Sequence, residues 1–80
     1  MDDRDVLKRI HNLVAEERHL REKSTGHGLA ADQQARLREL EEGLDQCWDL
    51  LRQRRAHEEY GEDPDSARTR PVGEVEGYLQ

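Results

Sequence analysis

Hydrophobic residues recur every three or four positions in two separate stretches of the chain. In the first stretch these positions are held by Val6, Ile10, Leu13 and Leu20, with Glu17 where a further apolar residue would complete the repeat. In the second stretch they are held by Leu37, Leu40, Leu44, Cys47 and Leu51. This spacing places the side chains on one face of an α-helix. The pattern therefore predicts two amphipathic helices, over residues 4–24 and 32–60.

The two helices are separated by residues that do not favour helix. The run from Ser24 to Gly28 contains two glycines, which predicts a turn over residues 25–31. Asp32 is the candidate N-cap of the second helix, because a short acidic side chain can accept a hydrogen bond from a free backbone N–H.

The two apolar stripes match in reverse order. Val6 pairs with Leu51, Ile10 with Cys47 and Leu13 with Leu44, and in each pair the residue numbers add up to 57. A single antiparallel register therefore aligns the stripes and places the turn at the glycines. The sequence predicts an all-α fold, an antiparallel two-helix hairpin of the coiled-coil type.

A third part of the chain follows the second helix. Gly61 and Pro64 predict the end of that helix, and we expect residues 61–80 to form an acidic, non-helical tail. Two docking places are open to the tail, namely the end of the second helix, which extends past the first helix, and a protein partner. The apolar side chains available for docking are Pro71, Val72, Val75, Tyr78 and Leu79.

The apolar faces of both helices are wider than one partner helix needs. A two-stranded contact uses about two positions in seven, whereas the helices of a bundle use about three. The surplus predicts that two hairpins pair into a four-helix bundle, so the chain is expected to form a homodimer. The residues expected at this or a related interface are Leu7, Val14, Trp48, Leu50 and Tyr78.

Composition and charge exclude several classes of partner. Charged residues make up 40% of the chain, apolar residues 32%, and the net charge is −6. An acidic chain gains little from contact with phosphates, so neither nucleic acid nor an anionic membrane surface is an expected partner. No apolar run approaches the length of a membrane span, and the N-terminus lacks the features of a signal peptide. The single cysteine, Cys47, cannot form an internal disulfide, which favours a cytoplasmic location.

No pattern typical of a catalytic site is present, so we expect no enzymatic activity and no cofactor. Glu16 and His19 have the Glu-x-x-His spacing of di-iron bundles, and Glu17 lies on the inward stripe. A dimer would duplicate these residues, which leaves a metal-binding, ferritin-like bundle as an alternative. The second helix supplies no inward carboxylate, however, so Glu16, Glu17 and His19 are expected to be solvated charges without a metal.

The other polar candidates also have ordinary structural explanations. Cys47 occupies an inward position of the second helix, where a thiol packs as a small apolar group. Three arginines lie near the C-terminal end of this helix among acidic residues, which favours ion pairs on the helix surface. The residues concerned are Asp49, Arg52, Arg54, Arg55, Glu58 and Glu59.

Several runs of this sequence resemble a known family. The run Leu44–Arg55, which reads LDQCWDLLRQRR, and the tail runs 63–65, 70–72 and 75–78 resemble domain-of-unknown-function family 2630, a family of small uncharacterised actinobacterial proteins. The run Leu29–Asp32 departs from the expected Ser or Thr cap followed by acidic residues. The resemblance implies a short stand-alone helical protein and adds no chemistry. Taken together, the sequence favours a non-enzymatic structural or protein-interaction module that self-associates through its hairpin.

Overall fold

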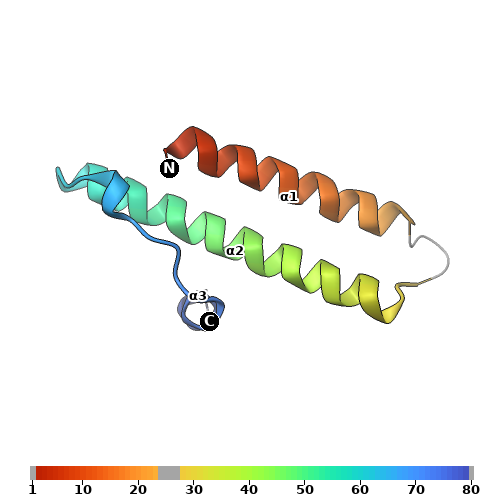
Figure 1. Cartoon of the computed structure of the whole chain (residues 1–80). Coiled ribbons are helices and arrows are strands. Elements are labelled where there is room, and N and C mark those ends of the chain that lie inside the picture. Colours follow the sequence, from red (N-terminus) through yellow and green to blue (C-terminus); the bar gives the residue numbers. More distant parts are fainter. Residues whose placement is uncertain (1, 24–27, 80) are drawn as a thin grey trace.

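The computed structural model describes residues 2–23 and 28–79, with side chains described as far as Glu76. Two long helices, α1 (Asp3–Lys23) and α2 (Ala31–Glu59), are followed by a single 3-10 turn, η1 (Pro64–Ser66), and a short helix, α3 (Val72–Leu79). The described ranges contain no strand. Helices α1 and α2 run antiparallel along each other (Figure 1), which confirms the all-α hairpin.

The predicted limits of the long helices are close to the observed ones. Helix α1 begins at Asp3 and α2 ends at Glu59, each within one residue of the prediction. The predicted end of the first helix and most of the predicted turn lie outside the described residues. Asp2 caps α1, since its Oδ1 accepts a hydrogen bond from the Asp5 N–H at 2.9 Å.

The expected N-cap of α2 is wrong by two residues. The helix begins at Ala31, so Asp32 lies within its first turn and Ala30 is the capping residue. Alanine has no side-chain acceptor. The free backbone N–H of Ala30 is instead satisfied by the Gln33 side chain, whose Oε1 accepts its hydrogen bond at 3.0 Å. The carboxylate of Asp32 still lies at the positive end of the helix dipole.

The core confirms the antiparallel match of the two stripes. Val6 and Ile10 of α1 are buried in one cluster with Cys47, Leu50 and Leu51 of α2. Leu13 and Leu44 pack against this cluster from the two helices. The partners that the sequence pairs therefore lie together near the open end of the hairpin.

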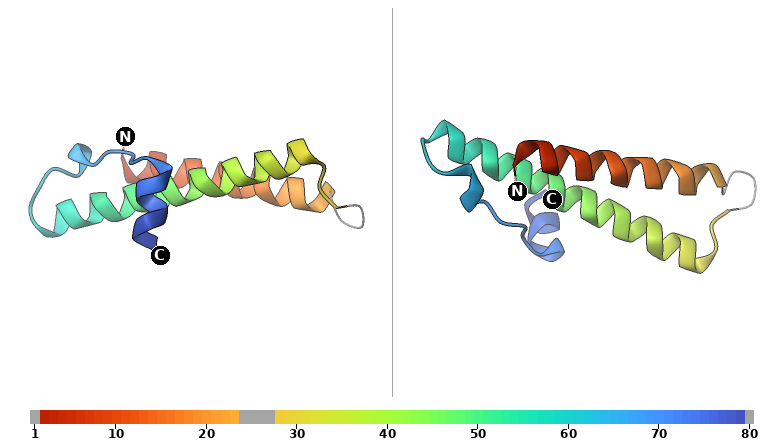
Figure 2. Two further views of the ribbon diagram at one scale, coloured as in Figure 1. Left: turned by 90° about the horizontal axis from the view of Figure 1, so that it is seen from below. Right: turned by 45° about the horizontal axis from the view of Figure 1, so that its top comes forward.

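The expectation of a non-helical tail is wrong. The C-terminal segment, residues 61–79, contains η1 and α3, and both pack on α2. Gly61 ends α2 with a φ of +71°, and the next N–H, of Glu62, donates a hydrogen bond back to the His57 carbonyl at 2.7 Å. This motif reverses the chain, so the segment returns along α2 (Figure 2).

Local capping and one buried side chain explain the helices of the C-terminal segment. Asp63 Oδ1 accepts a hydrogen bond from the Asp65 N–H at 2.9 Å and starts η1, with Pro64 at its first position. The Pro71 carbonyl accepts hydrogen bonds from the N–H groups of Glu74 and Val75 at the start of α3. Val75 is 0% exposed. Burial on α2 thus outweighs the poor helix propensity of the two glycines in this helix, Gly73 and Gly77.

Candidate functional site

The C-terminal segment lies on α2 and leaves another side of the hairpin uncovered. Figure 2 shows it running back along α2, with α3 crossing that helix on the side away from α1. The α2 residues beneath it are mostly polar, and several come directly before inward-facing positions. They are Gln46, Asp49, Leu50 and Gln53.

A buried ion pair joins α2 to the C-terminal segment. Asp49 is 1% exposed, and both of its carboxylate oxygens contact the guanidinium of Arg70. The Arg70 Nε donates to Oδ2 at 2.9 Å, while Nη2 forms the second bond, with Oδ1. Gln53 Nε2 also donates to Asp49 Oδ2 at 2.9 Å. The forked geometry makes this a bidentate, charge-assisted contact.

Two glutamines of α2 bind the backbone of the segment. Gln53 Nε2 donates to the Arg68 carbonyl at 2.8 Å, and Gln53 Oε1 accepts from the Arg68 N–H at 3.4 Å. About two turns earlier in α2, Gln46 Nε2 donates to the Arg70 carbonyl at 3.1 Å. The side-chain amides thus satisfy backbone groups of an extended stretch that has no secondary structure of its own.

Arg54 joins three elements at the open end of the hairpin. Its side chain is 6% exposed and contacts Asp3 at the start of α1, with 2.5 Å between Nε and Oδ1. Its Nη1 donates to Asp65 Oδ1 at 3.0 Å and to the Pro64 carbonyl at 3.2 Å, both in η1. The two carboxylates, of Asp3 first and Asp65 second, raise the pKa of Arg54.

The sequence interpretation of Asp49 and Arg54 as surface ion-pair residues is wrong. Both are buried, and their partners Arg70, Asp3 and Asp65 lie far away along the chain. One signal was available, since Arg54 continues the three-and-four spacing of Cys47 and Leu51 and so occupies an inward position. A second signal is the resemblance of the tail runs, because these contain the two partners Asp65 and Arg70.

The ion pair of Asp49 predicts acid sensitivity. The Arg70 guanidinium, and to a lesser degree the Gln53 amide, lower the pKa of Asp49 from its ordinary value, although burial opposes them. A carboxyl with a lowered pKa in the folded state stabilises the fold above its unfolded-state pKa, and this contribution disappears as the pH falls through the folded-state value. We expect the free energy of unfolding to decrease as the pH is lowered below about 4.

Urea titrations between pH 6 and pH 2 measure this effect. The Asp49→Asn variant should be less stable at pH 6 and should lose less stability on acidification. The Glu58→Gln variant removes an exposed acid from the same helix and is the matched control. An acid response of Asp49→Asn equal to that of the unmodified protein would contradict the role given to Asp49.

Three of the five side chains expected at an interface are exposed on the hairpin. Leu7 is 38% exposed, Val14 39% and Trp48 44%. The expectation that Leu50 is exposed for an interface is wrong. Leu50 is only 7% exposed and belongs to the core, where the C-terminal segment covers it. The side chain of Tyr78 lies outside the described part of the structure.

The metal-ligand candidates are not brought together with other ligands. Glu16 contacts Arg36 of α2, and Glu17 contacts Arg21, with 3.4 Å between Glu17 Oε1 and Arg21 Nε. His19 is exposed on α1. Within the described residues, no group of three or more His, Cys, Asp or Glu side chains is placed to hold a metal ion. The geometry thus gives no support to the ferritin-like alternative.

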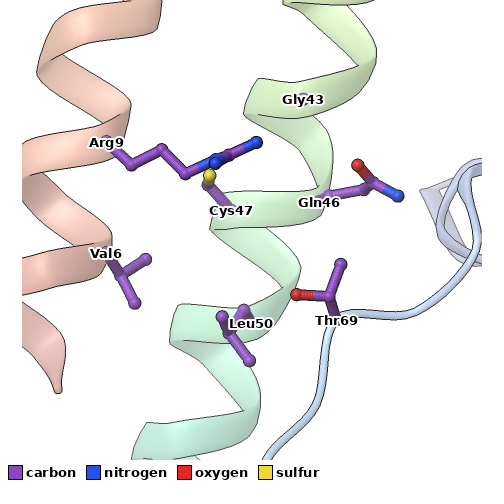
Figure 3. Close-up of a pocket in the computed structure, with 7 residues that line it drawn as sticks. All are labelled: Val6, Arg9, Gly43, Gln46, Cys47, Leu50 and Thr69. Carbon is purple, nitrogen blue, oxygen red and sulfur yellow. The ribbon is translucent and has the colours of Figure 1, made fainter. Parts of the chain in front are cut away.

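A small cavity lies between the hairpin and the C-terminal segment (Figure 3). Its volume is about 160 Å³, and Arg9 extends across it from α1 toward α2. Cys47 is among its lining residues, although this residue is only 5% exposed. The lining residues are Val6, Arg9, Gly43, Gln46, Cys47, Leu50 and Thr69.

The geometry defines a helical hairpin with a docked C-terminal segment, and none of the described helices is long and apolar enough to cross a bilayer. The family model of a protein of unknown function (DUF2630) matches residues 2–80, and the chain belongs to this family. It is similar to two uncharacterized proteins, Rv0898c of Mycobacterium tuberculosis and Mb0922c of Mycobacterium bovis. Each is 49% identical over 77 residues, which are 95% of this chain and 88% of the relative. No solved structure matches the chain.

Proposed function

We propose that this protein is a non-enzymatic interaction module that forms a homodimer through one side of its hairpin. The observation that carries the proposal is the exposure of three large apolar side chains of the hairpin, Leu7, Val14 and Trp48. We call these three residues the apolar flank.

Helix geometry places the three residues on a common side. Leu7, Val14 and Trp48 each follow a residue of the packed stripes, namely Val6, Leu13 and Cys47. In an antiparallel pair of right-handed helices, residues that follow inward positions lie on the same side of both helices. The residues that contact the C-terminal segment, such as Gln46 and Gln53, instead precede inward positions and lie on the other side.

The three residues of the apolar flank also lie at neighbouring levels along the hairpin. In the register in which paired residue numbers add up to 57, Trp48 lies at the level of residue 9 of α1, between Leu7 and Val14. Seven residues of α-helix span roughly 10 Å, and His11 lies between Leu7 and Val14 on the same side of α1. Tryptophan is also the residue type that most often dominates the binding energy of an interface.

The charges around the apolar flank favour a second copy of the same chain as the occupant. The concavity beside Val14 is lined by both acidic and basic residues, Glu17, Arg18, Arg21 and Glu22. The surface beside Leu7 is mixed in the same way, with Asp3 next to Arg4 and Lys8. A mixed rim gives little attraction to a strongly charged partner, but it can complement its own copy about a two-fold axis. Two hairpins joined in this way form a four-helix bundle.

Sedimentation equilibrium tests this proposal with two aromatic truncations. We expect the unmodified chain to sediment as a dimer, and Trp48→Ala to weaken the dimer by about thirtyfold or more, as expected for a central aromatic worth 2 kcal/mol. Tyr60→Ala is the matched control, because Tyr60 is 78% exposed and lies at the end of α2, outside the apolar flank. Circular dichroism confirms that each variant remains helical.

A second pair of variants removes the ambiguity of a truncation that alters folding. Val14→Lys places a charge within the apolar flank, whereas Ala15→Lys places the same charge one position further, outside it. Only Val14→Lys should produce monomers. An unmodified chain that stays monomeric up to high micromolar concentration would overturn the proposal, as would equal effects of the two lysine variants.

We also propose that the module acts in the cytoplasm. Its single cysteine, Cys47, is a buried free thiol, which fits a compartment where disulfides are not maintained.

A further inference from the structure

We propose that the C-terminal segment is a strap that opens from α2 as a unit while the hairpin stays folded, and that salt promotes this opening. The inference rests on the chemistry of the contact between the segment and α2, and it does not depend on the proposed dimer.

The contact is dominated by charged and polar groups. It consists of the Arg70–Asp49 pair, the Asp65–Arg54 pair and the side-chain amides of Gln46 and Gln53 bound to the segment's backbone. Each of these groups can exchange its protein partner for water when the strap opens. Opening therefore costs less than separating an apolar interface of the same size.

As far as the side chains of the strap are described, the apolar part of the contact is small. Within the described side chains, Val75 is the one fully buried apolar residue of the strap, and Ala67 packs at the edge of the core cluster. By contrast, α1 and α2 bury Val6, Ile10, Cys47 and Leu51 in one shared cluster. The hairpin and the strap should therefore differ widely in the free energy needed to open them.

The ion pairs make the contact sensitive to salt. In both pairs one partner is exposed to ions in the solvent, because the side chain of Arg70 is 31% exposed and that of Asp65 is 66% exposed. Screening acts on such partners more strongly than on fully buried ones. When the strap opens, it uncovers Leu50 and Asp49 on α2.

Amide hydrogen exchange of the full chain, resolved by residue with NMR, tests this proposal. The reporters in the strap are the N–H groups of Ala67, Arg68 and Val75, which donate hydrogen bonds in the docked state. We expect them to exchange at least tenfold faster than the amides of Ile10 and Leu51. Raising the salt from 50 mM to 500 mM should accelerate the strap amides several-fold and leave the two hairpin amides nearly unchanged.

Two full-length variants separate the ion pair from general effects of charge. Arg70→Gln removes the forked contact with Asp49 and should accelerate the strap amides by about tenfold or more, consistent with a charge-assisted hydrogen bond. Glu74→Gln removes only the exposed contact of Glu74 with Arg70, at 3.4 Å. It should change the exchange rates of the strap amides by less than threefold. The hairpin amides should respond to neither variant.

Three results would overturn the inference. The strap amides could exchange at the rate of the hairpin core, which would mean that the chain opens only as a whole. Their rates could be insensitive to both salt and Arg70→Gln. Finally, the strap amides could be unprotected at low salt, which would mean that the strap is not docked. The salt series on the unmodified chain decides the question even if Arg70→Gln unfolds.

Discussion

The Leu51→Ala variant should lower the free energy of unfolding by about 2–5 kcal/mol. Leu51 is 3% exposed and lies in the cluster that joins Val6 and Ile10 to α2. Truncation removes the transfer free energy of the side chain and leaves a cavity that two rigid helices cannot fully close. Since a domain of this size has roughly 4–12 kcal/mol of stability in total, the loss is a large fraction of it.

Urea denaturation followed by circular dichroism measures this loss, and Leu7→Ala is the matched control. Leu7 is 38% exposed, so its truncation in the monomer should cost less than about 1 kcal/mol. Dimerisation would bury Leu7 as well, so both variants are compared at several protein concentrations. A cost for Leu7→Ala that rises with concentration supports the proposed dimer. If Leu51→Ala and Leu7→Ala lost the same unfolding free energy at every protein concentration, the register of the hairpin would be contradicted.

The hairpin was predictable because its signal is local and repeated. Val6, Ile10 and Leu13 in one helix and Leu44, Cys47 and Leu51 in the other specify both the inward faces and the register, and the burial pattern follows them. Each residue contributes to the same periodicity. One polar residue at an apolar position, such as Glu17 in α1, therefore does not change the predicted fold.

Helix α3 was not predictable in the same way. Eight residues with Gly73 and Gly77 among them have a low intrinsic tendency to form helix, and their sequence shows no repeated stripe. The helix is explained by the burial of Val75 and by the placement of Pro71 at its start. Those contacts depend on where the chain returns to α2, which a local pattern does not contain.

The polar part of the candidate site was missed for a related reason. Asp49 and Arg54 have oppositely charged neighbours within four residues of α2, so nearby ion pairs explain them from sequence alone. Their actual partners are 21 residues away for Asp49, and 51 and 11 residues away for Arg54. The inward position of Arg54 in the stripe and the resemblance of the tail runs that contain Asp65 and Arg70 were the two signals against that explanation.

The Arg54→Ala variant should lower the melting temperature by about 10–20 °C. The side chain of Arg54 is 6% exposed, and its acceptors among the described residues include the carboxylates of Asp3 and Asp65 and the carbonyl of Pro64. Alanine leaves these acceptors without their shared donor and opens a space where the start of α1, the end of α2 and η1 meet. The loss therefore affects the hairpin and the C-terminal segment together.

Differential scanning calorimetry checks this prediction, and two further variants sharpen it. Arg55→Ala removes an exposed arginine at the next position and should change the melting temperature by less than about 3 °C. Arg54→Lys keeps the charge but loses the planar guanidinium that reaches acceptors on two elements. Its melting temperature should therefore lie between those of Arg54→Ala and the unmodified chain. If Arg54→Lys were as stable as the unmodified chain, charge alone would explain the role of this residue. If Arg54→Ala lowered the melting temperature no more than Arg55→Ala does, the contacts of Arg54 with the three elements would contribute nothing to stability.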